Sequence, residues 1–142
     1  SAGADTLALQ NSSVHTLMAI NNLDPDANGL PLITSDITIN GNGSTIKRSP
    51  TVATPQFRLF KVKPSTGILT LNSVTLSNGQ LSTSGGAIYN QGIITLNNTT
   101  LSGNNAILKG GGILTTGGTV TLNNSVLSNN HSSGNGAYLS GR

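Results

Sequence analysis

The chain has 142 residues, a net charge of +3 and no cysteine, so it suits one domain without disulfides or thiolate metal sites. Only 3% of the residues are aromatic and 35% are hydrophobic, which excludes a core of large side chains but suits a narrow core of stacked aliphatic residues. No apolar run approaches the about 20 residues that a membrane-spanning helix needs.

The basic residues are spread along the chain, and no group of them is as dense as nucleic-acid binding requires. The densest group combines Lys47 and Arg48 with Lys61 and Lys63. We expect these side chains to be solvated charges at the rim of the fold, and we expect no nucleic-acid partner.

In chain order, residues 1–36 predict an N-terminal capping segment and a first coil, and residues 37–142 predict a series of similar coils. Polar and apolar residues alternate over residues 5–10, as in a half-buried strand, and a turn at 11–13 leads to a second strand over 14–20. Residues 21–29 are typical of a polar loop with two turn signals. Residues 30–34 predict a third strand.

Further strands are predicted at residues 36–40, 44–46, 57–62, 68–72 and 74–78, with a Pro-containing loop over 47–56. A clear repeat follows. Gly85-Gly86-Ala87-Ile88-Tyr89 returns 25 residues further on as Gly110-Gly111-Gly112-Ile113-Leu114, and a partial copy begins at Gly136. A period of this length indicates a solenoid.

Four of the strands carry an apolar residue, Thr, a second apolar residue and Asn, in that order. Side chains alternate across a strand, so the apolar pair points to one face and the Thr and Asn point to the other. Repeats stacked about 4.8 Å apart would form aliphatic columns inside, Thr columns outside and Asn columns at the corners. The outward residues are Thr38, Asn40, Thr70, Asn72, Thr95, Asn97, Thr121 and Asn123.

These patterns predict an all-β fold, namely a right-handed, single-stranded parallel β-helix of about four to five coils that is truncated at its C-terminus. Gly and Asn at the bends tolerate left-handed backbone angles, and stacked Asn amides can hydrogen-bond one another. The last partial coil, residues 134–139, is followed by no polar cap, so we expect self-association through it.

The motif at residues 110–113, followed by Val-Thr-Leu-Asn-Asn-Ser at 120–125 and Leu-Ser-Asn-Asn at 127–130, resembles the repeats of a known group of proteins. These are bacterial surface or secreted proteins with the right-handed parallel β-helix, or pectate-lyase-like, fold, including polymorphic outer-membrane proteins and adhesin-like passengers. The resemblance implies a secreted or cell-surface location and a scaffold or adhesive role. It implies little about chemistry, because this fold carries many unrelated functions.

Acidic residues are absent from position 37 to the end of the chain. A glycosidase needs paired carboxylates, and a calcium-dependent polysaccharide lyase needs an acidic cluster, so both kinds of centre are excluded from the central coils. Asp24, Asp26 and Asp36 are better explained by turns than by a metal site. No cofactor and no metal are expected.

The alternative to a binding module is a hydrolase, most plausibly a carboxylesterase that uses Ser and His. The chain has two imidazoles, His15 and His131, and Ser128 and Ser132 lie close to His131 in the sequence. These four residues are the candidate catalytic groups. The outward Thr and Asn columns suggest a further alternative, a regular uncharged face that binds carbohydrate or ice.

Overall fold

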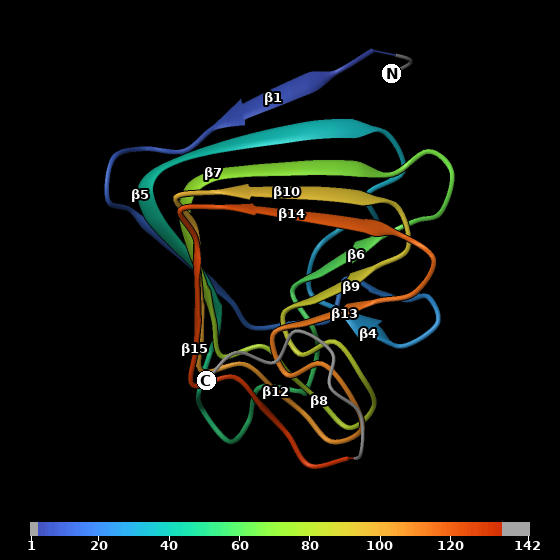
Figure 1. Ribbon diagram of the computed structural model, residues 1–142. Helices are drawn as coiled ribbons and strands as arrows, with labels where there is room; N and C mark the ends of the chain where they lie inside the picture. Colours follow the sequence, from blue (N-terminus) through green and yellow to red (C-terminus); the bar gives the residue numbers. More distant parts are fainter. Residues whose placement is uncertain (1–2, 135–142) are drawn as a thin grey trace.

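A computed structural model describes residues 3–134, and this part of the chain is all-β, with sixteen strands and no helix. Most strands are short, and β5 and β7 are the longest (Figure 1). The strands are β1 Asp5–Ala8, β2 Val14–Leu17, β3 Asn22–Leu23, β4 Ala27–Asn28, β5 Asp36–Arg48, β6 Phe60–Val62, β7 Ile68–Ser77, β8 Gln80–Leu81, β9 Ile88–Asn90, β10 Ile93–Asn97, β11 Thr100–Ser102, β12 Asn105–Ala106, β13 Ile113–Thr115, β14 Thr119–Asn123, β15 Val126–Ser128 and β16 His131–Ser132.

Parallel pairing dominates the fold. The largest sheet has the order β1-β5-β7-β10-β14, with β2 paired to β5 and with β11 between β7 and β15. Two three-stranded parallel sheets, β8-β12-β16 and β6-β9-β13, lie on the other sides of the molecule (Figure 1). Among the named strands of residues 3–134, only β3 and β4 pair antiparallel.

The predicted columns are confirmed by the strand register. Thr38 pairs with Thr70, Thr70 with Thr95, and Thr95 with Thr121. The neighbouring aliphatic and Asn positions pair in the same register, so like residues lie over like. Thr6 of β1 extends the Thr column by one more strand, because it pairs with Thr38.

The aliphatic columns form the core, as the alternation predicts. Leu71 and Leu96 are completely buried, as are the residues two positions before each of them. Leu122 continues the same column but is 38% exposed, because β14 is the edge strand of its sheet within the described residues. Burial in this column therefore depends on having a neighbouring strand on both sides.

The Asn column is a hydrogen-bonded ladder. The side-chain amide of Asn72 donates to Oδ1 of Asn40, that of Asn97 to Asn72, and that of Asn123 to Asn97, each at 2.8 Å. Each amide thus satisfies the next one along the stack. The prediction of stacked, mutually bonded Asn side chains is confirmed.

The bends use the left-handed backbone region, also as predicted. After the Asn column, Asn42, Ser73, Asn98 and Asn124 all have φ between +48° and +52°. Asn visits this region more readily than most residues because its short polar side chain can hydrogen-bond locally. The repeated residue type therefore reflects a repeated backbone angle.

The prediction of a strand over residues 30–34 is wrong. Pro31 has no N–H to donate to a ladder, and Ile33 makes only an isolated bridge to Val62. The preceding segment, predicted as a loop, instead contains the β3–β4 hairpin. Its turn is fastened by the amide of Asn28, which donates to Asn22 Oδ1 and to the carbonyl oxygens of Asp24 and Asp26.

The expectation of solvated basic side chains is wrong for Arg48 and Lys61, which are 6% and 3% exposed. Lys47 and Lys63 are half-buried. The predicted partial coil at residues 134–139 lies outside the described residues apart from Gly134, so self-association through it stays a prediction.

Candidate functional site

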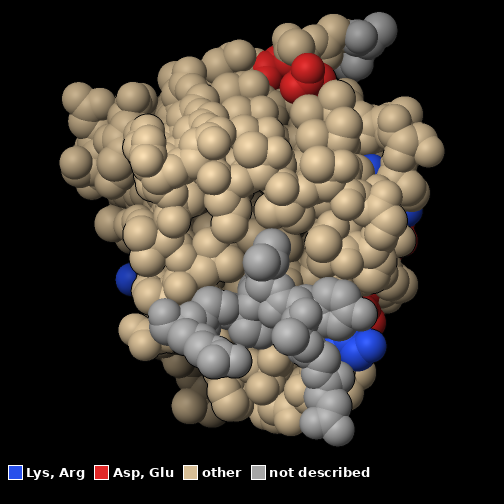
Figure 2. Space-filling view, in the orientation of Figure 1, with Lys and Arg blue, Asp and Glu red and all other residues tan. Residues whose placement is uncertain are grey.

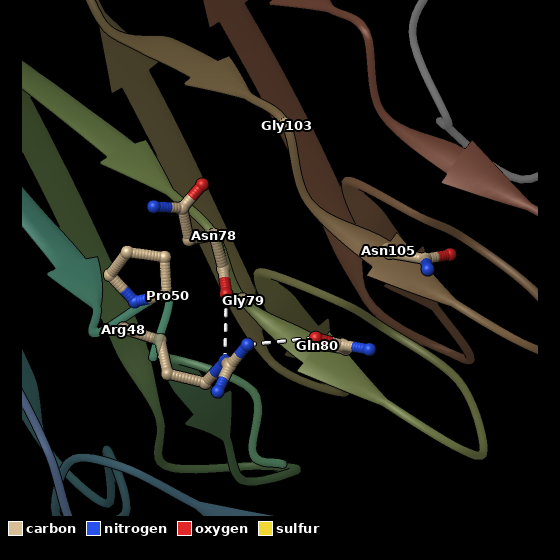
Figure 3. A pocket seen from close by; sticks show the side chains of 7 residues that line it. All are labelled: Arg48, Pro50, Asn78, Gly79, Gln80, Gly103 and Asn105. Carbon is tan, nitrogen blue, oxygen red and sulfur yellow. Dashed lines mark hydrogen bonds between the residues drawn. The ribbon is translucent and has the colours of Figure 1, made fainter. Parts of the chain in front are cut away.

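A small polar hollow lies at the corner between the end of β7 and β8, and we call it the Arg48 pocket (Figure 3). Its volume is about 300 Å³. Arg48 enters it from β5, and the other lining residues come from the β7–β8 and β11–β12 junctions and from the loop after β5. They are Pro50, Asn78, Gly79, Gln80, Gly103 and Asn105.

The guanidinium of Arg48 organises this pocket. Its Nε donates to the carbonyl of Asn78 at 3.0 Å, and Nη2 donates to Oε1 of Gln80 at 2.7 Å (Figure 3). Nη1 donates to the carbonyl oxygens of Thr54 and Pro55, which anchors the loop after β5. Burial lowers the pKa of Arg48, but a guanidinium stays charged in proteins.

Glycine keeps the corner open. Gly103 has φ of +65° at the same type of corner where Asn78 has +60° and Asn129 has +54°. The backbone geometry is shared, but Gly103 adds no side chain, which leaves space in the pocket wall. A Cβ at Gly79 would collide with the carbonyl oxygen of Gly86, so this second glycine is needed for the close packing of the two chain segments.

One N–H of Arg48 remains without an acceptor among the described residues. A guanidinium has five N–H groups, and Arg48 uses four of them on protein acceptors. Unpaired buried polar groups are uncommon, so this N–H indicates that water or a ligand completes the site. Oδ1 of Asn105 is also buried without a hydrogen-bond partner among the described residues, but this amide points away from Arg48 (Figure 3).

Rows of hydroxyl groups run from the pocket along the outer face of the C-terminal parts of β5 and β7 and of strands β11 and β15. Thr45, Thr75 and Thr100 pair in one column, and Ser77, Ser102 and Ser128 pair in a second one that directly precedes the pocket corners in the chain. The sequence reasoning missed this face. The recurring Thr-x-Ser spacing at 75–77 and 100–102 could have revealed it, because alternate residues share a strand face.

The predicted Thr and Asn columns lie on a different part of the large sheet, over β5, β7, β10 and β14 (Figure 1). Here the Asn amides bond one another, which leaves fewer of their groups free for a ligand. Ile93 beside the Thr column is 46% exposed, so this face is mixed polar and apolar. Figure 2 shows a molecular surface with few charged side chains.

The structure brings His15 to a serine that sequence reasoning did not select. Nε2 of His15 lies 2.8 Å from Oγ of Ser13, on the same side of the chain two residues earlier. Ser13 Oγ also lies 2.9 Å from Oγ of Ser44 and 3.0 Å from the carbonyl of Gln10. The Ser-x-His spacing was the available signal, because a strand places residues i and i+2 on one face.

The hydroxyl of Ser44 donates to the Gln10 carbonyl at 2.6 Å, and the N–H of Ser13 donates to Ser44 Oγ at 3.1 Å. The Ser13 hydroxyl has a single proton, which it can donate either to the Gln10 carbonyl at 3.0 Å or to Nε2 of His15 at 2.8 Å. Donation to His15 is the arrangement that a serine nucleophile and its base require. Within residues 3–134, Nδ1 of His15 has no hydrogen-bond partner that would orient the ring.

The other three candidates lie at the opposite end of the described chain. Nε2 of His131 lies 3.2 Å from Oγ of Ser133, a serine that was not among the candidates. Ser128 lies on β15 and pairs with Ser102, and Ser132 lies on β16 and pairs with Ala106. His131 is exposed.

A charged cluster joins the β3–β4 hairpin to β6. Arg58 is completely buried and donates to Asp26 Oδ2 at 3.2 Å and to Asn28 Oδ1 at 2.9 Å. Burial lowers the pKa of Arg58, against the opposing effect of Asp26. Lys63 pairs with Asp24 at 3.1 Å.

Lys61 belongs to the same cluster but has no carboxylate within salt-bridge distance among the described residues. Its Nζ lies 4.5 Å from the ring centroid of Tyr89, and the guanidinium of Arg58 lies 5.1 Å from the same ring. Burial, followed by the charges of Arg58 and Lys63, lowers the pKa of Lys61. The ion pairs of Arg58 with Asp26 and of Lys63 with Asp24 fasten the hairpin to the sheet.

No group of three or more His, Cys, Asp or Glu side chains that could hold a metal ion occurs within residues 3–134. The described residues also form no helix long and apolar enough to cross a membrane. No protein-family model, curated protein or solved structure matches this chain.

Proposed function

We propose that this chain is a right-handed parallel β-helix of the bacterial surface or secreted type, and that it serves as a rigid scaffold that binds neutral glycans. Support for the architecture comes from the parallel, in-register pairing of equivalent strands and from the Asn ladder. Support for the location comes from the resemblance of its Gly- and Asn-rich repeats to surface proteins. A scaffold stiffened in this way presents its binding groups without further ordering, which favours affinity.

The Arg48 pocket is the observation that carries the glycan proposal. It combines one guanidinium N–H without an acceptor among the described residues, the side-chain amide of Gln80 and open space at Gly103. Sugar hydroxyls both donate and accept hydrogen bonds, so they suit such a set of groups. The two hydroxyl columns that lead to the pocket would extend the site along a chain of several sugar units.

Binding without cleavage is the expected outcome. Glycoside hydrolysis requires a pair of carboxylates across the scissile bond. Position 37 and all later positions lack Asp and Glu, and the pocket is formed entirely by residues from this part of the chain. The bound glycan should therefore be recovered intact.

A glycan array followed by calorimetric titration tests this proposal. Gly103→Asn is the most informative variant, because Asn already occupies the equivalent corner at positions 78 and 129 with similar φ, so the fold should be retained while the pocket is filled. Gly117→Asn is the matched control, since Gly117 has φ of +72° and open space around it at another corner.

We expect at least tenfold weaker glycan binding for Gly103→Asn and unchanged binding for Gly117→Asn. Equal affinities of the two variants would overturn the pocket as the binding site. If the protein inhibits ice growth and binds no glycan on the array, the Thr and Asn columns would instead be favoured as an ice-binding face. Light scattering across a range of concentrations would test self-association, which a constant monomer mass would exclude.

Ester hydrolysis is the second candidate function, and the 2.8 Å contact between Ser13 and His15 is the observation that favours it. In this reaction Ser13 Oγ would attack the ester carbonyl while Nε2 of His15 takes the serine proton and passes it to the leaving alcohol. Water would then hydrolyse the acyl-serine with the same base. Turnover should be slow, because the N–H of Ser13 already bonds Ser44 and cannot stabilise the oxyanion.

Short-chain nitrophenyl esters provide the assay for this candidate. Ser13→Ala and His15→Ala should each lower kcat/KM about 100-fold if the pair is a nucleophile and its base. Ser133→Ala and His131→Ala form a matched control, because they carry the other Ser and His contact of the described chain. If both pairs of variants lose the same activity, or if neither pair loses any, Ser13 and His15 are not the catalytic site.

A further inference from the structure

We infer that the N-terminal end of the fold contains a binding site for a single acyl chain. The site is a cavity of about 410 Å³, which we call the N-terminal cavity. This inference goes beyond glycan binding. It stands on the cavity and does not require that Ser13 and His15 hydrolyse anything.

The cavity exists because the first coil closes the aliphatic core incompletely. Its floor is formed by well-buried side chains of the core, including Ile39, Ile46 and Phe60, which are at most 6% exposed. Leu7 on β1 lines the mouth and is 54% exposed. Core-facing aliphatic residues at this end therefore remain in contact with solvent.

The walls come from several separate segments, so the space is a cleft and not a flat apolar patch. Leu9 follows β1, Leu17 ends β2, and Leu30 lies in the segment that runs on from the β3–β4 hairpin to β5. Ile37 contributes from β5 itself. A flexible alkyl chain can contact aliphatic side chains on several sides here.

The chemistry of the lining selects the ligand class. No Asp, Glu, Lys or Arg lies among the described residues that line the cavity, which disfavours a ligand with charge inside it. Polar groups are few, namely His15, Thr34 and Ser35. Ligand pockets commonly have volumes of about 300–1,000 Å³, apolar walls and a small number of polar groups, and this cavity has all three properties.

His15 determines which end of the ligand faces outward. Its imidazole lines the cavity and also contacts Ser13, whose hydroxyl lies at the edge of β2. An acyl carbonyl or a hydroxyl at the end of an alkyl chain can hydrogen-bond this pair while the chain occupies the apolar interior. The ligand class is therefore a single-chain acyl ester or long-chain alcohol of neutral charge.

Calorimetry with octanol, decanol and dodecanol tests the inference without any chemical turnover. Each methylene buried should tighten binding about fourfold until the cavity is full, with a negative heat-capacity change. Leu7→Asp places a carboxylate at the mouth, at an exposed position with little effect on folding, and should weaken decanol binding at least tenfold. Leu23→Asp is the matched control, since Leu23 is 70% exposed and lies outside the cavity.

The outcomes separate this inference from ester hydrolysis. Decanol binding that Leu7→Asp abolishes supports the acyl-chain site, whether or not nitrophenyl esters are cleaved. Hydrolysis with equal rates for short and long acyl chains, together with no decanol binding, would overturn the acyl-chain site and leave the hydrolase. Affinity independent of chain length, or equal loss in Leu7→Asp and Leu23→Asp, would also overturn it.

A second copy of the chain is the competing occupant of the cavity. In that case sedimentation would detect a dimer, decanol would dissociate it, and the apparent decanol affinity would fall as the protein concentration rises. This result would overturn the inference. We expect the sedimentation coefficient to stay unchanged when decanol binds.

Discussion

The aliphatic column that runs through the fold permits a matched pair of substitutions. Leu96 and Leu122 pair directly in the register of β10 and β14, yet Leu96 is completely buried and Leu122 is 38% exposed. The two variants Leu96→Ala and Leu122→Ala therefore remove the same atoms from adjacent levels of one column. They differ only in how much of the side chain is enclosed.

Leu96→Ala loses three buried carbons, worth about 2.4 kcal/mol of transfer free energy, and leaves a closed cavity that adds about 1 kcal/mol. Because Leu122 is 38% exposed, Leu122→Ala loses only about 1.5 kcal/mol of transfer free energy. Its site is open to solvent, so the substitution leaves no enclosed cavity. The free energy of unfolding should therefore fall about 2 kcal/mol further in Leu96→Ala than in Leu122→Ala.

Urea unfolding followed by circular dichroism measures both values, and the dependence on urea concentration should stay the same in the two variants. Thermal midpoints should fall by about 14 °C for Leu96→Ala and about 6 °C for Leu122→Ala in a chain of this size. Losses within about 0.5 kcal/mol of each other would show that neighbouring strands do not determine burial in the column. The proposed stacking would then be refuted.

Three further predictions concern the ladder, the corners and the charged cluster. Asn97→Ala breaks two ladder hydrogen bonds and Asn123→Ala breaks one, so urea unfolding should show losses of about 2 and about 1 kcal/mol, and equal losses would count against the ladder. The backbone φ at Asn98 is +48°, a left-handed value that Gly adopts freely and Val does not. Asn98→Gly should therefore keep the thermal midpoint, whereas Asn98→Val should lower the free energy of unfolding by about 1–2 kcal/mol. An unchanged free energy of unfolding in Asn98→Val would contradict this reasoning. Burial and the charge of Arg58 lower the pKa of Lys61, so the unfolded chain binds the proton more tightly and stability should rise with pH up to the ordinary lysine pKa. Lys61→Met should remove that rise in urea midpoints, and an unchanged pH profile would be evidence against it.

The repeated columns could be predicted because two simple periods act together. Alternation along a strand separates the inner from the outer side chains, and a repeat of about 25 residues brings equivalent positions to the same level. Thr70, Asn72 and Leu71 are then placed by their neighbours in sequence and by their copies in adjacent repeats. No long-range contact outside the repeat is needed for this prediction.

The candidate sites were less predictable because their residues come from segments outside the repeat. The loop after β5 folds back so that Arg48 reaches the carbonyl oxygens of Thr54 and Pro55, and no local pattern indicates that closure. His15 could be chosen from the sequence as an imidazole, and the Ser-x-His spacing indicates Ser13 as a neighbour, but the spacing does not show how the Ser13 hydroxyl is oriented. Ser13 is oriented by Ser44, which is 31 residues away.

The strand alternation, the identity of the stacked columns and the absence of carboxylates from residue 37 onward follow from the sequence, because they depend on residue type and spacing alone. The three-dimensional fold was needed to show which cations are buried, where the Arg48 pocket opens and which end of the core stays accessible. Such features depend on the distance between segments that are far apart in the chain. A periodic pattern specifies how each repeat stacks on the next, but it contains no information about how an irregular loop or the N-terminal segment closes over the stacked strands.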